Sequence, residues 1–138
     1  MGLIRDIMEK NVITIENDKT ALDASKLLNE KKISFVVISK DGTPIGLVSE
    51  RDIMRKIAAE DKKASEVQIE DIMSKKFLWV KPEDGIEIAI QKMLNNNIRR
   101  LLVLENEKMV GVITQTDLAS FLRSKLLING TVEKLEAD

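Results

Sequence analysis

The sequence repeats itself once, without a gap, at a shift of 65 residues. Asp6 aligns with Asp71, Gly46 with Gly111, and Asp52 with Asp117. Many positions between these points match conservatively, so the similarity extends over most of the chain. A period of this length exceeds that of a solenoid repeat. The pattern therefore predicts two copies of one subdomain that pack as a pair, not a linear array.

Each copy is expected to form its elements in the same order, β-α-β-β-α. Short apolar runs predict strands, and apolar residues at helical spacing predict helices. In the first copy, Asp41-Gly42 between two apolar runs is a strong hairpin pattern. The expected elements are 12–15, 21–28, 35–39, 45–49 and 52–59 in the first copy, and 77–80, 86–94, 101–104, 110–114 and 117–125 in the second.

The expected fold is α/β, with two tandem β-α-β-β-α subdomains related by a pseudo-two-fold axis. A helix between the first strand and the hairpin implies parallel pairing in each small sheet. One half has too little core to be stable alone, so the two halves are expected to pack together. The expected domains are 1–60 and 71–125, joined by a charged linker at 61–70 and followed by a tail at 126–138.

Composition narrows the classes of function. The chain has no cysteine and no histidine, which removes thiolate chemistry and the commonest general base and metal ligand. Lys plus Arg number 22 against 23 for Asp plus Glu, and aromatics make up 3%, so nucleic-acid binding is not expected. No apolar run approaches the ~20 residues of a membrane span. These features favour a cytoplasmic protein that is not an enzyme, with no metal and no catalytic cofactor.

Two copies of one phrase carry the candidate site. GLVSERDI runs from Gly46 to Ile53 and GVITQTDL from Gly111 to Leu118. Ser or Thr followed three residues later by an acid is the capping-box pattern at a helix start. The same junction of strand and helix also suits a nucleotide, because free backbone N–H groups, a hydroxyl and a carboxylate lie together. The phrase by itself leaves both interpretations open.

The paired phrases, each closing a β-α-β-β-α unit, resemble tandem cystathionine-β-synthase (CBS) domains, the arrangement called a Bateman module. The resemblance covers about 6–121 and includes the DIM segments before each copy and the VITI strand. Val37 and Leu102 stand where the family often has a proline, which should alter strand geometry only slightly.

The resemblance implies that adenosine compounds, namely AMP, ADP, ATP or S-adenosylmethionine, bind in clefts between the repeats. Each cleft takes its ribose and phosphate contacts from one repeat and much of its adenine wall from the other. For cleft 2, the matching positions are Asp117 for ribose, Thr114, Thr116, Arg99 and Arg100 for phosphate, and Val12, Ile13, Ile33, Ser34 and Phe35 for the wall.

For cleft 1, the matching positions are Asp52, Ser49 and Arg51, with Phe77, Leu78 and Ile98 opposite. Ser34 and Phe35 stand there in place of Arg99 and Arg100, so cleft 2 is expected to bind phosphate better. A second interpretation of Arg99-Arg100 is a solvated pair at a strand start.

The expected function is a stand-alone regulatory module that binds an adenosine-type ligand and signals to an unknown protein or through a homodimer. The alternative is a structural dimerisation module with vestigial clefts. Apolar residues flanking the two phrases are expected to pair the repeats and to build the homodimer. They are Ile53, Ile57, Leu118 and Phe121.

Overall fold

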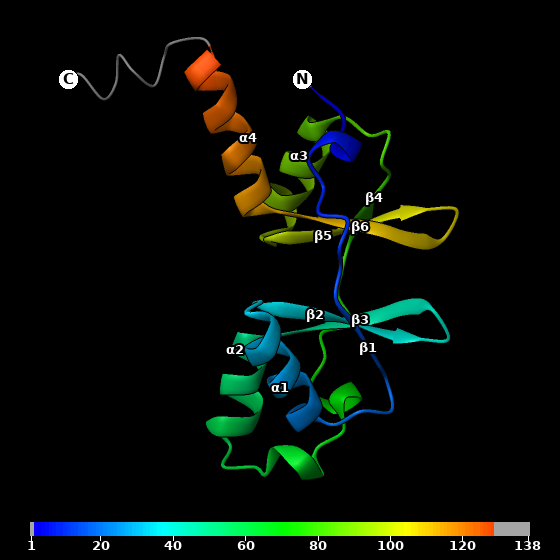
Figure 1. The fold of residues 1–138 in the computed structure, drawn as a ribbon, viewed down its shortest axis with the longest axis vertical. Helices are drawn as coiled ribbons and strands as arrows, with labels where there is room; N and C mark the ends of the chain where they lie inside the picture. The colour runs from blue at the N-terminus through cyan, green and yellow to red at the C-terminus, as the bar shows by residue number, and fades with distance from the viewer. Residues whose placement is uncertain (1, 129–138) are drawn as a thin grey trace, which may run out of the picture. The chain divides into compact units, whose positions relative to one another are not determined.

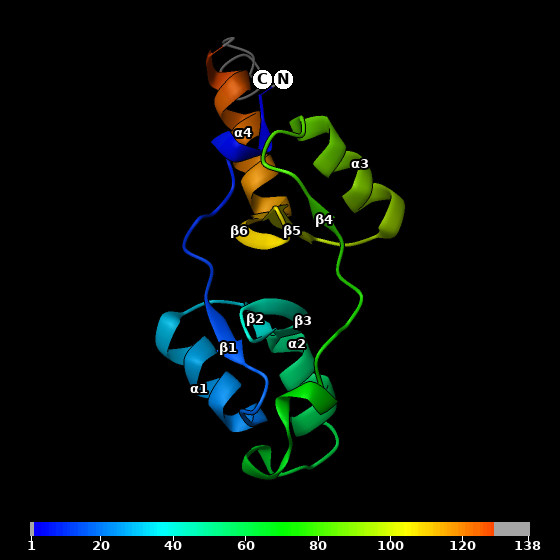
Figure 2. The same ribbon diagram turned by 90° about the vertical axis from the view of Figure 1, so that its right-hand side faces the viewer.

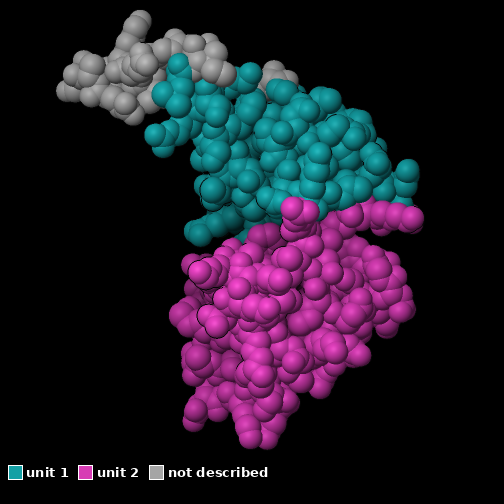
Figure 3. All heavy atoms as spheres, viewed as in Figure 1, with its two compact units in different colours: residues 1–10, 78–106, 110–138 teal, residues 11–77, 107–109 magenta. Residues whose placement is uncertain are grey.

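Two compact units make up the chain, and a computed structural model describes residues 2–128 of it. Unit 1 contains residues 1–10, 78–106 and 110–138, and unit 2 contains 11–77 and 107–109 (Figure 3). Unit 2 thus holds most of the first sequence copy, and unit 1 most of the second. The tail that we expected at 126–138 begins later, because residues 126–128 belong to the last helix. Residues 129–138 lie outside the described residues.

Unit 2 is a three-stranded sheet with its helices on one face (Figure 1). Its elements are β1 (Thr14–Glu16), α1 (Ala21–Lys31), β2 (Phe35–Lys40), β3 (Thr43–Ser49) and α2 (Glu50–Ile53), followed by a π-helical turn (Met54–Ala58). The strand order is β1-β2-β3. As predicted, β1 pairs with β2 in parallel across the crossover helix, and β2 pairs with β3 antiparallel.

Unit 1 has the same plan (Figure 2). Its elements are β4 (Trp79–Val80), α3 (Ile86–Asn96), β5 (Arg100–Glu105), β6 (Lys108–Thr114) and α4 (Gln115–Ile128). The strand order is β4-β5-β6, with β4 parallel to β5. The predicted order β-α-β-β-α is therefore confirmed in both units.

Equivalent positions of the two repeats build the two hydrophobic cores. Alternate residues of a strand face the same side of a sheet, so every second residue of β2 and β5 faces the helices. In unit 2, Val36 and Ile38 pack with Ala21, Ala24 and Leu28. In unit 1, Leu101 and Val103 pack in the same way with Ile86, Ala89 and Met93.

The segment that precedes each copy in the sequence packs in the core of the other copy. We call residues 1–10 and 68–77 the leading segments. Ile4 is fully buried in the core of unit 1, whereas its repeat partner Ile69 is fully buried in unit 2. Glu9 exchanges backbone hydrogen bonds with Val112 at 2.8 and 3.0 Å, and Ser74 does so with Leu47 at 2.8 and 3.0 Å. The exchange ties each compact unit to both sequence copies.

The glycine of each repeated phrase makes room for a leading segment. A Cβ placed on Gly111 would lie 2.9 Å from the carbonyl oxygen of Glu9 and 2.8 Å from the sulfur of Met8. A Cβ on Gly46 would meet Ser74 and Met73 at 2.9 and 2.6 Å. Two backbones cannot approach this closely over a side chain, so the glycine is required by packing.

The two hairpins share a turn but not its residues. Asp41 and Gly42 have φ of 52° and 82°, the backbone that the Asp-Gly pattern predicts. Asn106 and Glu107 in the second hairpin have φ of 52° and 67°. Glu107 therefore occupies the left-handed conformation that glycine occupies in the first hairpin.

The helices that follow the two phrases differ in winding. The expected continuous helix at 52–59 is instead α2 and then the π-helical turn, in which the N–H of Ala59 donates to the carbonyl of Met54 at 2.8 Å. In unit 1, α4 runs through Ile128 as a regular α-helix. A π-helical turn inserts one residue into the winding and often marks a functional position.

Candidate functional site

The repeated phrase forms the junction between the last strand and the last helix of each repeat. Ser49 caps α2, and its Oγ accepts a hydrogen bond from the N–H of Asp52 at 3.3 Å. Thr114 Oγ1 accepts one from the N–H of Asp117 at 3.2 Å. In return, each Asp carboxylate accepts a bond from the capping residue's N–H, at 2.8 Å in both copies. The capping interpretation of the phrase is therefore confirmed.

The carboxylate of Asp52 is heavily engaged. Its Oδ2 accepts hydrogen bonds from the N–H of Ser49 at 2.8 Å and from Ser49 Oγ at 3.1 Å. Its Oδ1 lies 3.3 Å from Lys56 Nζ. Sequence reasoning missed Lys56, although an acid followed four residues later by a lysine is a standard helical ion-pair spacing.

The carboxylate of Asp117 is much less engaged. Its Oδ2 accepts the N–H of Thr114, and Oδ1 has no protein donor among the residues that the structure describes. The residue four positions on is Phe121 rather than a lysine. Asp117 is therefore half-buried, fixed by its cap, and still able to accept further hydrogen bonds.

Other predicted residues surround the two junctions. Thr116 and Arg51 are exposed in the first turns of α4 and α2. The N–H of Gln115 donates to the carbonyl of Arg99 at 2.9 Å, and that of Glu50 to Ser34 at 2.9 Å. The backbone of Arg99 therefore lies beside the first turn of α4, and that of Ser34 lies at the same position of unit 2.

The two arginines do not lie on one face of the sheet. Arg99 lines a groove between α3 and α4. Leu101 and Val103, at alternate positions after Arg99, face the same helices. Arg100 is half-buried in β5 and, by the same alternation, faces the opposite side. Arg99 itself precedes β5, so the expectation that both arginines contact phosphate stays a prediction.

The predicted adenine walls are apolar and mostly half-buried. Ile13 and Ile33 pack partly against the core of unit 2, and Leu78 and Ile98 against that of unit 1. Val12, Phe35 and Phe77 are also half-buried in unit 2, whereas Ser34 is exposed. Each predicted cleft draws residues from both units. The meeting of these walls with Asp52 or Asp117 therefore stays a prediction.

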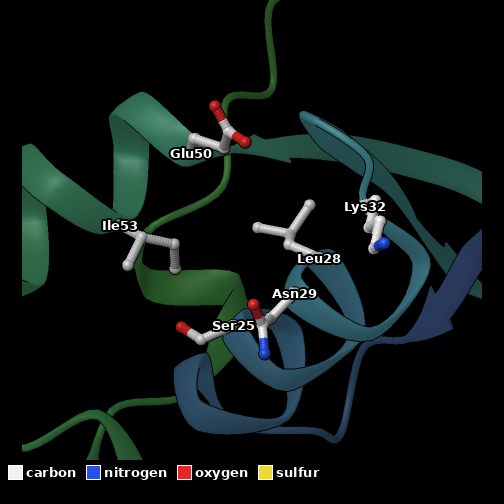
Figure 4. Close-up of a pocket in the computed structure, with 6 residues that line it drawn as sticks. All are labelled: Ser25, Leu28, Asn29, Lys32, Glu50 and Ile53. Carbon is white, nitrogen blue, oxygen red and sulfur yellow. The ribbon is translucent and has the colours of Figure 1, made fainter.

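A groove between the two helices of each repeat lies at equivalent positions. In unit 2 it has a volume of about 340 Å³, and Ser25, Asn29, Lys32 and Glu50 give it polar walls around Leu28 and Ile53 (Figure 4). In unit 1 it has a volume of about 450 Å³. Its walls are largely apolar there, with Ile90, Leu94, Leu118 and Leu122 among them.

The residues expected to form a homodimer are largely buried within their own units. Ile57 and Leu118 are only 5% and 6% exposed and belong to the two cores. Ile57 and Leu118 are therefore core residues, whereas Ile53 and Phe121 are half-buried. The homodimer itself stays a prediction. The large apolar side chains that unit 1 does expose on its two helices are Leu94, Leu122, Leu126 and Leu127.

Within the described residues, no helix combines the length and the apolar character that crossing a bilayer requires.

Comparison with known protein families shows to which family the chain belongs. The CBS domain model matches the chain twice, at residues 4–59 and 69–124. The chain belongs to the CBS domain family. MJ1426 of Methanocaldococcus jannaschii is 29% identical, over 87% of this chain and 90% of that protein. MK0525 of Methanopyrus kandleri is 31% identical over 83% of this chain, which spans only 60% of MK0525. Two further Methanocaldococcus jannaschii relatives, MJ1225 and MJ1232, are spanned to 45% and 40%.

Solved CBS structures share the fold. The CBS domain pair of MJ0100, in complex with 5′-methylthioadenosine and S-adenosylmethionine, superposes with a TM-score of 0.81 at 24% identity, covering 91% of this chain and 98% of that one. A conserved protein of Pyrococcus horikoshii superposes with a TM-score of 0.80 at 24% identity, covering 88% and 92%. A hexameric CBS-CP12 protein of bloom-forming cyanobacteria is 30% identical, with a TM-score of 0.76 and coverage of 86% and 70%. The predicted α/β fold of two CBS repeats is confirmed.

Proposed function

We propose that this chain is a regulatory CBS module that binds an adenosine-type small molecule and performs no catalysis. The candidate ligands are AMP, ADP, ATP and S-adenosylmethionine. The observation that carries the proposal is the carboxylate of Asp117, which its cap fixes at the start of α4 and which accepts one hydrogen bond from the protein. The adenosine compounds bound to the CBS pair of MJ0100 support this class of ligand.

The chemistry of ribose fits this carboxylate. A carboxylate has about four lone-pair positions, so Asp117 retains enough to accept both ribose hydroxyls. Hydrogen bonds to a charged group are each worth roughly 1.5–3 kcal/mol. Arg99, whose carbonyl is bonded to the first turn of α4, supplies a permanent positive charge near the phosphate position. Ligand binding would then bias the module toward one conformation, which a partner protein or a second copy detects.

Thermal unfolding with added ligands tests the proposal. A ligand that binds only the folded chain adds about 2.7 kcal/mol at a hundredfold excess over its dissociation constant. We expect AMP, ADP, ATP or S-adenosylmethionine to raise the melting temperature by several degrees. A 2′-deoxy analogue of the ligand that binds best should give a smaller shift, because it lacks one of the two hydroxyls.

Two results would contradict the proposal. If none of the four ligands changes the melting temperature at millimolar concentration, a structural module becomes the better explanation. If the chain converts ATP to ADP, it is an enzyme. Two homoserine O-acetyltransferases match this chain, but it spans only 22% and 24% of their lengths.

A second candidate function is self-association through unit 1. Leu94 is 76% exposed, and Leu122 is 43% exposed on the facing helix. Both line the same apolar groove, whereas Asn29 and Lys32 make the equivalent groove of unit 2 polar. The occupant that fits best is the same groove of a second copy, because two identical apolar faces match across a two-fold axis. The hexameric CBS-CP12 protein supports association between copies in general.

Light scattering of purified protein tests this candidate. We expect a dimer, and we expect Leu94→Ser with Leu122→Ser to convert it to a monomer. Leu3→Ser is the matched control, because Leu3 has the same exposure as Leu122, 43%, but does not line the groove. A monomeric wild-type chain would reject self-association without affecting the ligand proposal.

A further inference from the structure

The two repeats differ in how many protein hydrogen bonds their phrase carboxylates accept. Asp52 accepts hydrogen bonds from the N–H and the Oγ of Ser49, and its Oδ1 forms an ion pair with the Lys56 ammonium. Asp117 accepts the N–H of Thr114 as its one protein hydrogen bond within the described chain. The two aspartates are equivalent in sequence and in the N–H bond of the cap. They differ in the Ser49 hydroxyl bond and in the ion pair with Lys56, both of which belong to Asp52.

Lys56 is held at two points. Its Nζ donates to the carbonyl oxygen of Ile72 at 2.8 Å and lies 3.3 Å from Asp52 Oδ1. Ile72 belongs to the leading segment packed in unit 2 and is itself buried. The carbonyl therefore holds the ammonium beside Asp52. The ion pair does not depend on the two side chains alone for its geometry.

The remaining capacity of Asp52 is too small for a ribose. With about four lone-pair positions on a carboxylate, two hydrogen bonds and the ion pair with Lys56 leave about one, and a ribose diol needs two. The Asp52 side chain is only 18% exposed, which further limits the directions from which a ligand can reach it. Asp117 retains about three positions by the same reasoning.

The equivalent residue in unit 1 cannot compete for its carboxylate. Phe121 packs partly against the core of that unit. The next lysine on this helix, Lys125, has its Nζ 5.5 Å from the Phe121 ring centroid, one turn further from the phrase.

We propose that Lys56 closes the ribose-binding position of the first repeat, so that the chain binds its adenosine ligand at Asp117 alone. This inference rests on the proposed function and concerns which repeat performs it. This explanation of unequal binding differs from the one based on Arg99, whose equivalent in the first repeat is Ser34. The loss of that arginine affects only phosphorylated ligands. Lys56 acts on the ribose, which all candidate ligands share.

Isothermal titration with 5′-methylthioadenosine tests the inference. This probe carries the ribose diol and no phosphate, so a change of protein charge does not act through phosphate attraction. Wild type should bind one molecule per chain. Lys56→Met should bind two, with the new site within about tenfold of the affinity of the first. Phe121→Lys should weaken the wild-type site at least tenfold.

Arg55→Met is the matched control. Arg55 is an exposed cation of the same π-helical turn and is not a partner of Asp52, so this change removes the same charge and should leave one site. Thermal unfolding of each variant checks that it is folded. If Phe121→Lys does not fold, the stoichiometry of Lys56→Met decides alone.

The outcomes distinguish a failure of the role proposed for Lys56 from a failure of the proposed adenosine binding. Two sites in wild type, or one site in folded Lys56→Met, would overturn the role of Lys56 and leave the proposed function standing. Absence of binding by both proteins, with 5′-methylthioadenosine and with the four candidate ligands, would overturn the proposed function and this inference with it.

Discussion

Under the proposed function, the aspartate of the repeated phrase performs two tasks with one side chain. Oδ2 of Asp117 accepts a backbone N–H and completes the cap of α4, while Oδ1 accepts no hydrogen bond from the described residues and is the oxygen proposed to contact ribose. The two tasks use different lone pairs, so a helix cap and a ribose contact do not exclude each other. Substitution can separate them, because capping depends on an oxygen and ribose binding on a charged carboxylate.

We predict that Asp117→Asn weakens adenosine-ligand binding tenfold or more and changes stability little. Asn and Asp cap helices about equally well. Losing the charge weakens two hydrogen bonds that are each worth roughly 1.5–3 kcal/mol, and tenfold corresponds to about 1.4 kcal/mol. Titration calorimetry and thermal unfolding measure the two effects separately.

Asp84→Asn provides the control for that experiment. The Oδ2 of Asp84 also accepts a backbone N–H, from Lys81 at 2.9 Å, but the residue lies outside the phrase. Its substitution removes the same charge and should not change affinity. Unchanged affinity together with a clear loss of stability in Asp117→Asn would show that the phrase is a cap and not a ligand site.

At the level of the element, the two repeats can be compared at two features, the turn of each hairpin and the glycine of each phrase. The turns differ in sequence, whereas the glycines have the same role in both repeats. Glu107 has a positive φ where the first hairpin has Gly42, and both phrase glycines lie under a leading segment. The repeat allows each such feature to be tested by exchange between equivalent positions.

Glu107→Gly should stabilise the chain by about 1 kcal/mol. The left-handed conformation costs a non-glycine residue roughly 1–2 kcal/mol, and the greater flexibility of glycine in the unfolded chain offsets part of the gain. The reciprocal change, Gly42→Glu, should destabilise by a similar amount; no atom lies within 4 Å of the position of its Cβ, so strain rather than a clash would be the cause. Chemical denaturation measures both, and a less stable Glu107→Gly would contradict the argument.

Gly111→Ala should destabilise unit 1 by about 1–3 kcal/mol, the usual cost of forcing extra volume into a packed site. The sulfur of Met8 can move away from the new methyl group, but the carbonyl of Glu9 cannot, because it is bonded to Val112. Adding Met8→Ala should therefore not restore stability. Restoration in a double-mutant cycle would identify the methionine, not the backbone, as the obstacle.

For the whole molecule, the exchange of leading segments decides which fragments can fold. Fragment 11–77 contains Ile69 and Ile72, which are 0% and 2% exposed in the core of unit 2. Fragment 1–67 has the same length and lacks both. It carries Ile4 instead, which belongs to the core of unit 1.

We expect fragment 11–77 to show more helical circular dichroism and a more cooperative thermal transition than fragment 1–67. Burying a large aliphatic side chain contributes roughly 1.5–3 kcal/mol, so missing two of them is a large loss for a chain this short. Equal behaviour of the two fragments would contradict the assignment of the leading segments to the two units.

The sequence by itself determined the local structure and the membership of the CBS domain family. The 65-residue repeat, the apolar periodicities and the Asp41-Gly42 turn predicted β-α-β-β-α twice, and the two phrases predicted a cap at each last helix. These features depend on residues close together in the chain, so periodicity and turn chemistry express them directly. The acidic residue of each capping box, Asp52 or Asp117, could be predicted for the same reason.

Only the tertiary structure decided the contacts between distant segments. The sequence places the first leading segment before the first copy, but Ile4 packs beside Val80 and Ile86, because hydrophobic burial does not depend on order along the chain. The anchoring of Lys56 by the carbonyl of Ile72 arises in the same way. Each requires a backbone brought from elsewhere, which a pattern of neighbouring residues does not contain.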